Sequence, residues 1–171
     1  MPSIAFSPTT DSEPFTGLPR LPRALTDMAQ FTRQPATTRT LGIVSLFIPP
    51  TPILYRLTPE TAHDLRRTVS QRLTSVLRPN DRLYSITHWE WLILMPELLS
   101  TALLTLAMLR LRGSLSDAFS SLDGNSLTLE GHCGGALWPE NGTDPLFLLQ
   151  SARIARLHAG FGESGIEIYR P

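Results

Sequence analysis

The sequence contains no lysine, a single cysteine and no net charge. Its fifteen basic residues are all arginines and balance fifteen acidic residues, so no bulk attraction to nucleic acid or to an anionic membrane is expected. The lack of lysine is most simply explained by a GC-rich coding bias, although the planar guanidinium of arginine also suits phosphate groups. Cys133 alone can form neither an internal disulfide nor a multi-cysteine zinc site, which fits a reducing compartment such as the cytoplasm.

The sequence also lacks an uninterrupted apolar run of membrane-span length. Residues 91–109 come closest, with Glu97 as their only charged residue. Pro96 divides this run into a strand-like part and a leucine-rich part with a different period, so we expect no membrane insertion. The N-terminus shows no basic region followed by an apolar core, so no signal peptide is predicted and a cytoplasmic location is expected.

A chain of 171 residues is long enough for one domain of ordinary size with a single core. Residues 1–12 are polar, contain Pro2 and Pro8 and show no periodicity, which is typical of a flexible leader or linker. We therefore assign one domain to residues 13–171. The linker-like composition of the first residues leaves open that the chain is one piece of a longer polypeptide.

Hydrophobic periodicity and turn residues predict an alternation of helices and strands. The apolar, β-branched run at 40–48 is typical of a central strand, and Thr58 and Pro59 suit the start of a strong helix. The other predicted helices lie at 16–33, at 97–112 and from Asp144, which is expected to cap its helix, to near Gly160. The other predicted strands lie at 82–86, 91–95 and 165–169, with one or two more within 125–139. This order predicts an α+β fold, in which helices flank a mostly antiparallel sheet of five or more strands. The predicted core contains Leu65, Val69, Leu73, Leu94, Leu103, Leu148 and Ile168.

Five segments are similar, in order and spacing, to the motifs of one known family. They are FTGLPRL (15–21), RLTSVLRPND (72–81), THWEW (87–91) with LILMP after it, GGALWPENGTD (134–144) and LLQSARIARLHAG (148–160). Together they resemble the GGDEF domain of diguanylate cyclases across residues 13–171. The last segment, for example, is similar to the family's Leu-Leu-x-x-Ala-Asp-x-Ala helix. The resemblance implies the GGDEF fold, with THWEW in the place of the catalytic turn.

The residues at this turn depart from the family's pattern. The two glycines that let a nucleotide approach the backbone correspond to Thr87 and His88, and the metal-binding acid corresponds to Trp89. Glu90 is retained, and Trp91 replaces a phenylalanine. Condensing two GTP molecules requires a carboxylate pair to hold divalent metal on the triphosphate, together with cations for the leaving phosphates.

Two further positions lack the residues that the family uses. The first strand carries a carboxylate in the family, whereas SLFI (45–48) has none, and the lysine of the last helix falls at or near Gly160. We therefore expect no cyclase activity, no catalytic residue, no bound metal and no cofactor.

The side chains of the turn could serve a function other than cyclase catalysis. His88 and Glu90 lie two positions apart and on one face of a hairpin, but no third metal ligand is evident, so we expect a solvent-exposed turn pair. Trp89 and Trp91 are expected to pack against the rest of the chain. A turn that bears tryptophan at 87–91 also suits contact with a protein partner.

The tetrapeptide RPND (78–81) is the only Arg-x-x-Asp in the chain and lies five residues before the turn. In family members that keep an inhibitory site at this position, the arginine and the aspartate bind cyclic di-GMP, with help from another arginine on the following helix. The resemblance implies that Arg78 forks onto guanine or phosphate acceptors and that Asp81 accepts hydrogen bonds from guanine. Arg110 or Arg112 is the expected helper. The alternative is a surface ion pair, or an aspartate that caps the start of a strand.

Two functions of different classes follow from these residues. The first is a catalytically inactive receptor that binds cyclic di-GMP and signals to a protein partner, for which an exopolysaccharide secretion system is a candidate by analogy. The second is a ligand-free protein-interaction module that docks to a partner or forms a homodimer. Neither function involves nucleic acid or membrane insertion. The fold does not decide between them, because function depends on the site.

Overall fold

The computed structural model describes residues 11–33, 39–120, 124 and 126–171. Of the predicted leader, Asp11 and Ser12 fall within this part of the chain, and residues 1–10 lie outside it. The elements, in chain order, are α1 (Leu21–Thr32), β1 (Leu41–Phe47), the short helix η1 (Leu54–Arg56), α2 (Pro59–Ser75), β2 (Arg82–Thr87), β3 (Glu90–Pro96), α3 (Thr101–Gly113), β4 (Phe119–Ser120), β5 (Ser126–Leu127), β6 (His132–Trp138), α4 (Pro145–Ala159) and β7 (Ile166–Ile168).

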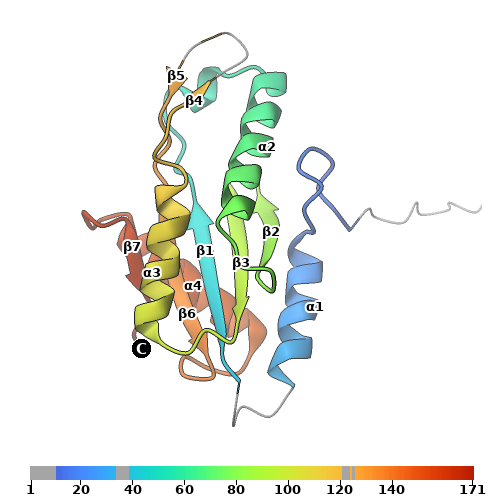
Figure 1. Cartoon of the computed structure of the whole chain (residues 1–171), viewed down its shortest axis with the longest axis vertical. Coiled ribbons are helices and arrows are strands. Elements are labelled where there is room, and N and C mark those ends of the chain that lie inside the picture. The colour runs from blue at the N-terminus through green and yellow to red at the C-terminus, as the bar shows by residue number, and fades with distance from the viewer. Residues whose placement is uncertain (1–10, 34–38, 121–123, 125) are drawn as a thin grey trace, which may run out of the picture.

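Five strands form one sheet in the order β2-β3-β1-β6-β7, with β1 in its centre (Figure 1). β1 pairs antiparallel with β3 and β6, β2 pairs antiparallel with β3, and β7 joins β6 in parallel. β4 and β5 form a separate two-stranded ribbon. These pairings confirm the predicted α+β fold, the mostly antiparallel sheet and the central position of the strand near 41–48.

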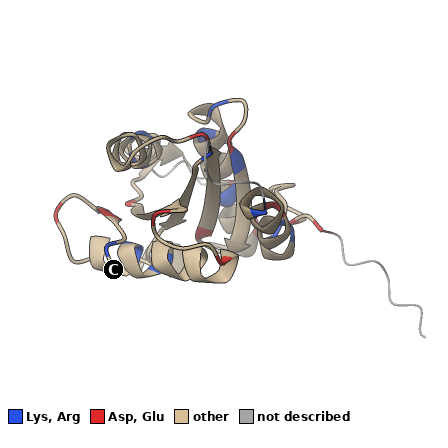
Figure 2. Ribbon diagram, turned by 90° about the horizontal axis from the view of Figure 1, so that it is seen from below, with Lys and Arg blue, Asp and Glu red and all other residues tan. Residues whose placement is uncertain are grey.

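Helices cover both faces of the sheet, as the view from below in Figure 2 shows. Alternate residues of β1 face opposite ways: Val44 and Leu46 pack with α2 and α3, whereas Leu41 and Ile43 pack with α1 and α4. All four are at most 1% exposed, which explains why β1 is apolar on both sides. The core therefore consists of two apolar layers with the sheet between them. Within the described residues, no helix is long and apolar enough to cross a membrane.

The start signals of two helices act as predicted. The Thr58 hydroxyl accepts a hydrogen bond from the Thr61 backbone amide, and Pro59 occupies the first turn of α2. At the start of α4, the Asp144 carboxylate accepts a hydrogen bond from the Phe147 amide in the same way. Each cap satisfies an amide that has no partner inside its helix, which is why the helices begin at these residues.

α3 differs from the prediction in its start and in its buried face. It begins at Thr101 instead of residue 97, and the Ser100 hydroxyl caps it. Leu103, predicted to lie in the core, is 45% exposed, because leucines all round the helix hide which face is buried. The buried residues of α3 are Leu104, Met108 and Leu111. The other predicted core residues are buried, except that Ile168 on the edge strand β7 is partly exposed.

The turn between β2 and β3 is tighter than the predicted THWE connection. Thr87 and Glu90 pair across the two strands, so only His88 and Trp89 form the turn. The register shifts between Ser85 and Thr87, which is the mark of a β-bulge. Glu90 is therefore a strand residue, with its side chain directed by the sheet.

α4 lies directly on the backbone of β6. A Cβ atom added at Gly134 would lie 2.1 Å from the Ala152 carbonyl oxygen and 2.1 Å from the Arg156 amide nitrogen, both of which are backbone atoms. A glycine is therefore required at this position by space. The close approach brings the polar side chains of α4 within reach of the sheet.

Gly134→Ala is expected to lower the free energy of unfolding by about 3 kcal/mol, because α4 must move away from β6 to admit the methyl group. Urea denaturation measures this change. Gly113→Ala is the control, since nothing lies within 4 Å of a Cβ atom added at this helix end. The control should change the free energy by less than about 1 kcal/mol. Equal midpoints for Gly134→Ala and the wild type would show that α4 does not approach β6 this closely.

Candidate functional site

Glu90, the first residue of β3, is buried in a cluster of charged groups. Only 4% of the residue is exposed, so the prediction of a solvent-exposed pair with His88 is wrong for Glu90. Arg153 of α4 donates to both carboxylate oxygens, at 2.7 and 3.0 Å. Arg156 lies 2.9 Å from Oε1 of the carboxylate and donates to the Ser45 hydroxyl at 2.9 Å. Ser45 in turn donates to Glu90 at 3.2 Å, so β1, β3 and α4 meet at one carboxylate.

Arg153 and Arg156 stabilise the ionised form of the Glu90 carboxylate and contact both of its oxygens. Burial by itself raises the pKa of Glu90, but the hydrogen bond from Arg153 and the charges of Arg156 and Arg153 outweigh it and hold that pKa below its usual range. The Arg156 guanidinium also lies over the Phe47 ring, 4.9 Å from its centroid. Guanidinium groups contact both oxygens of Glu90, so a metal ion would have to compete with two cations for this carboxylate. The described residues contain no group of three or more His, Cys, Asp or Glu that could hold one.

The tryptophans of the turn pack against α2. The Trp91 indole is fully buried and donates to the Ser70 hydroxyl at 3.0 Å. Trp89 is partly buried, and its ring centroid lies 6.4 Å from that of Trp91 in an edge-to-face arrangement. Both side chains therefore pack as predicted. Trp91 has no exposed surface with which to contact a partner.

Arg66 of α2 ties the turn to the N-terminal segment. Only 2% of it is exposed, and it donates to the His88 carbonyl oxygen at 2.8 Å. Its Nη1 atom lies 3.4 Å from the carboxylate of Glu13, which also accepts a hydrogen bond from the Thr16 hydroxyl at 2.6 Å. Of the predicted contact residues in the turn, Thr87 and His88 remain exposed.

Four residues that complete these clusters were not predicted as site residues from the sequence. They are Ser45, Arg66, Arg153 and Arg156, of which only Arg66 lies outside the segments compared above. The available signal is the spacing of the last two, which places both guanidinium groups on one side of a helix otherwise rich in alanine and leucine. Their acceptor, Glu90, lies 63 positions before Arg153, so a local sequence pattern cannot predict the pairing.

Arg78 and Asp81 of RPND form an ion pair with each other. Nη2 of Arg78 donates to Oδ1 of Asp81 at 2.8 Å and to the Pro96 carbonyl oxygen at 2.9 Å. Oδ2 of Asp81 accepts a hydrogen bond from the Arg78 backbone amide at 2.8 Å, which closes the turn before β2. The Asp81 side chain is only 2% exposed, whereas that of Arg78 is 43% exposed. The hydrogen bond to Asp81 raises the pKa of the Arg78 guanidinium, and the surface ion pair considered as an alternative is present.

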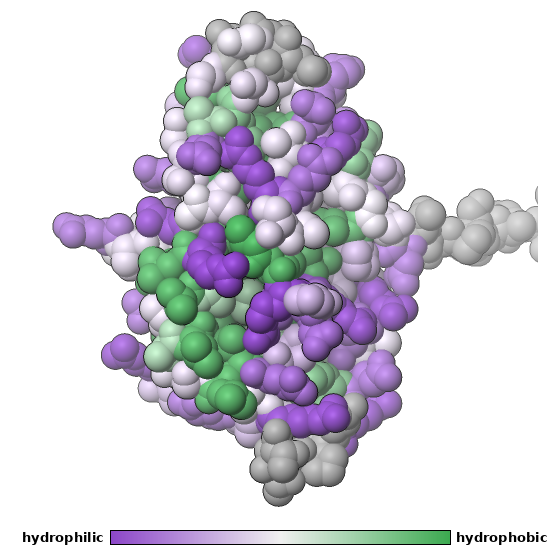
Figure 3. All heavy atoms as spheres, viewed as in Figure 1, coloured by the Kyte–Doolittle hydropathy of each residue, from purple (hydrophilic) through white to green (hydrophobic). Residues whose placement is uncertain are grey.

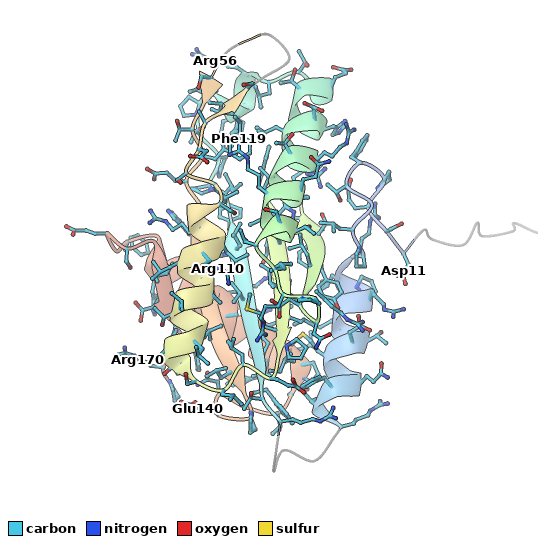
Figure 4. The ribbon with its side chains drawn as sticks, in the orientation of Figure 1. Asp11, Arg56, Arg110, Phe119, Glu140 and Arg170 are labelled. Atoms are coloured by element: carbon cyan, nitrogen blue, oxygen red, sulfur yellow. The ribbon has the colours of Figure 1, made fainter. Side chains whose placement is uncertain are left out.

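Arg110 of α3 lines the same cleft as this pair. The cleft encloses about 140 Å³, and its other walls are apolar residues of α3, of the segment before it, of β3 and of the end of α2. Figure 4 marks Arg110 on α3, and its guanidinium group makes no hydrogen bond or ion pair with any described residue. Arg112, the other predicted helper, donates to the Gly131 carbonyl oxygen at 3.1 Å and lines a different hollow. The structure brings together Arg78, Asp81 and Arg110, but not Arg112.

Glu90→Gln is expected to lower the free energy of unfolding at neutral pH by about 3 kcal/mol, because it leaves two largely buried guanidinium groups without an anion. The folded state holds the pKa of Glu90 below its ordinary value of 4.5. The stabilisation is therefore complete above that value and is lost as the pH falls through the lowered, folded-state pKa. Urea denaturation of both proteins between neutral pH and about pH 3 should show a difference that shrinks in acid.

Asp64→Asn is the matched control for this experiment. Asp64 forms a surface ion pair with Arg67 in which the two side chains are 38% and 50% exposed. Exposed pairs contribute at most about 1 kcal/mol, so the control should remain close to the wild type. An equal loss in the two variants, or a Glu90→Gln difference that does not change with pH, would contradict the role of the buried cluster.

No protein-family profile and no curated protein sequence matches this chain. Solved structures do match it. The GGDEF domain of YfiN from Pseudomonas aeruginosa superimposes with a TM-score of 0.83 and 19% identity, over 91% of this chain and 99% of that one. The FimX GGDEF domain from the same organism gives a TM-score of 0.81 and 16% identity, over 95% of this chain and 100% of that one. The GGDEF domain of DgcB from Caulobacter crescentus gives 0.75 and 12% identity, over 95% and 98%.

Identities this low establish the fold and not the chemistry of the site. The chain also differs from the family's helix motif at the site itself, because Arg153 stands where that motif has an aspartate after the alanine. The substitution supplies the cation that binds Glu90. Over its described part, the chain has the fold of a GGDEF domain, with a mixed, mostly antiparallel five-stranded sheet flanked by four helices.

Proposed function

We propose that this chain is a catalytically inactive receptor domain that binds cyclic di-GMP and passes the signal to a protein partner. The observation that carries the proposal is the convergence of Arg78, Asp81 and Arg110 on one cleft. A guanidinium group suits a phosphodiester and the acceptor edge of guanine, and a carboxylate suits the donor edge of guanine. The cleft combines both within one small volume.

Binding requires Arg78 and Asp81 to exchange partners. In the absence of ligand, the Arg78 guanidinium is bonded to the Asp81 carboxylate, which is almost fully covered. A phosphate oxygen or the acceptor edge of guanine can replace that carboxylate on Arg78, because the arginine side chain is 43% exposed. The released Asp81 then accepts hydrogen bonds from N1 and the exocyclic amine of guanine.

Arg110 supplies the second cation of the proposed site. It gives up no hydrogen bond or ion pair to other described residues when it binds a phosphate. Leu106 and Leu103, about one and two turns before it, line the cleft and offer an apolar surface to the guanine ring. A cleft of about 140 Å³ is smaller than the roughly 300–1,000 Å³ of typical ligand pockets. We therefore expect one guanine and its phosphate to enter, while the rest of the ligand lies over the exposed face of α3.

A related structure supports the class of ligand. The DgcB GGDEF domain was solved in complex with cyclic di-GMP. It shares the fold of this chain at 12% identity, so the ligand is carried over here as part of the proposal. The residues that would recognise it are those of RPND and α3.

The absence of catalysis is the second part of the proposal. Its support is that Glu90 is bound by Arg153 and Arg156 and that β1 presents Ser45 to this cluster, where no second carboxylate is available. The receptor is proposed to act in the cytoplasm. By analogy with degenerate relatives, a component of an exopolysaccharide secretion system is the proposed partner.

Cyclic di-GMP is expected to bind the purified chain, and Arg78→Ala and Arg110→Ala should each weaken binding by about ten- to a hundredfold. The reason is that hydrogen bonds to charged groups contribute about 1.5–3 kcal/mol each. Isothermal titration calorimetry measures the dissociation constants. Arg112→Ala is the matched control, because Arg112 lies on the same helix but donates to Gly131, and it should bind like the wild type.

Two results would reject the cleft as the ligand site. One is the absence of heat at about a hundred micromolar cyclic di-GMP, which would place any affinity below a useful range. The other is an equal loss of binding in Arg78→Ala and Arg112→Ala. Asp81→Asn adds a test of base recognition, since it should reduce the preference for cyclic di-GMP over cyclic di-AMP.

The chain is expected not to convert GTP to cyclic di-GMP in the presence of magnesium or manganese. Trp89→Asp, which returns an acid to the turn, should not restore activity, because Glu90 stays bound to the arginines of α4 and β1 still carries Ser45. Chromatography of the reaction mixture measures the product. Product above a protein-free blank, from either protein, would overturn this part of the proposal.

A ligand-free interaction module is the second candidate, and the surface of α3 favours it. Figure 3 shows a large apolar patch over this helix. Four leucines of the patch, Leu99, Leu103, Leu106 and Leu109, are 45–72% exposed. Contiguous apolar surface of this kind marks interaction sites in soluble proteins. If calorimetry detects no ligand, this becomes the function that the surface supports.

A further inference from the structure

On its sheet side, α4 buries Leu148 and Leu149 in its first half and only small residues in its second half. The small residues are Ser151, Ala152, Ala155 and Ala159, all at most 2% exposed. The outer face carries a row that we call the α4 stripe, formed by Leu146, Gln150, Ile154 and Leu157 and continued by Phe161, two residues past the helix end at Ala159. Its four apolar members are 55%, 43%, 60% and 93% exposed, in that order. The apolar residues of the stripe are therefore not buried in the core of this chain.

The stripe runs straight along the helix. Its spacings are four, four, three and four residues, which at 3.6 residues per turn confines it to an arc of roughly 80°. This is the width of the seam by which helices pair in coiled coils. In Figure 2 the helix along the lower side of the sheet, α4, has no other described element outside it. The stripe is thus a narrow, uncovered seam.

We propose that the α4 stripe pairs antiparallel with the α4 stripe of a second copy of this chain. With Ile154 at the two-fold axis, Leu146 meets Phe161 of the second copy, Gln150 meets Leu157 of the second copy, and Ile154 meets its own equivalent. In an isologous two-fold contact the same surface of each copy faces the other in the opposite direction, so its residues must be complementary to themselves in reverse order. The α4 stripe meets this requirement. The antiparallel arrangement also brings opposite ends of the two helix dipoles together.

Charge does not oppose this contact. The stripe contains no charged residue, and the two arginines of α4 are bound to Glu90 on the inner side. Two copies can therefore approach without repulsion between like charges at the seam. Gln150 is the polar member, and a single polar residue in such a seam fixes the register at some cost in stability.

The area suits a reversible dimer. The stripe exposes on the order of 600 Å² per copy, so pairing buries about 1,200 Å² in total, at the lower limit of specific interfaces. Because area alone does not fix affinity, we expect a reversible contact whose dissociation constant is to be measured.

The dimer does not depend on the proposed ligand site. α4 packs with α1 on one face of the sheet, whereas Arg78 and Arg110 line a cleft with α3 on the other face. Ligand binding and self-association can therefore fail separately, and each has its own variants.

Disulfide crosslinking tests the symmetry of the contact. The single native cysteine, Cys133, is fully buried, so an introduced cysteine gives a clean signal. Under mild oxidation, Ile154→Cys should form a covalent dimer, because residues at a two-fold axis come within disulfide distance. Leu106→Cys, which is similarly exposed on α3, is the control and should remain monomeric. Ile154→Cys that crosslinks no faster than this control would overturn the proposal.

A mixed experiment tests the orientation. Leu146→Cys and Phe161→Cys proteins should crosslink with each other when they are combined, and each should crosslink poorly alone. Efficient crosslinking of each protein with itself instead would show that the helices pair in parallel, which contradicts the proposed arrangement.

Sedimentation equilibrium without ligand measures the strength of the contact. The wild type should dimerise reversibly, Leu157→Glu should weaken dimerisation at least about tenfold, and Gln150→Leu should tighten it. Leu106→Glu is the control on α3 and should dimerise like the wild type, while Leu157→Glu should still bind cyclic di-GMP as the wild type does. A wild type that stays monomeric near millimolar concentration, or an equal effect of the two glutamate variants, would overturn the pairing of α4.

Discussion

The burial of one ionised carboxylate is the constraint on which the arrangement of the site depends. A carboxylate as covered as that of Glu90 is stable only if cations and hydrogen-bond donors surround it. Arg153 and Arg156 supply them, so α4 must lie close to the ends of β1 and β3. That position in turn requires Gly134, since a side chain there would collide with the helix backbone. The same contacts direct both oxygens of Glu90 toward guanidinium groups of α4.

Features governed by neighbouring residues could be predicted from the sequence. Thr58 and Asp144 cap their helices because a hydroxyl or carboxylate three positions before an amide meets it in almost any context. The strand at 41–47 is buried on both faces, and its nearly continuous run of apolar residues predicts this burial. The resemblance of five spaced segments gave the fold, and the structural matches bear it out at 12–19% identity.

Features governed by distant contacts could not be predicted in the same way. Glu90 was expected in an exposed turn, because a turn glutamate is usually solvated and its partners on α4 lie 63 and more positions away. Leu103 was expected in the core, because α3 has leucines on every side and its periodicity does not distinguish the buried face. Arg110 and Arg112 were equal candidates, since two positions on a helix differ by about 200° in direction and only the tertiary structure decides which faces the cleft.

The inner face of α4 explains why the large apolar residues in the second half of this helix lie on its outer side. Positions 153 and 156 carry the arginines that bind Glu90, and the contact with Gly134 leaves room only for small residues nearby. Large apolar side chains cannot occupy this part of the inner face, so the hydrophobic residues of the second half of the helix stand on the opposite side. Water disfavours such a row at roughly 25 cal/mol per Å² of exposed apolar surface, a cost that a second α4 stripe can remove. The charged cluster around Glu90 and the apolar stripe on the outside of α4 thus both follow from the way this helix packs on the sheet.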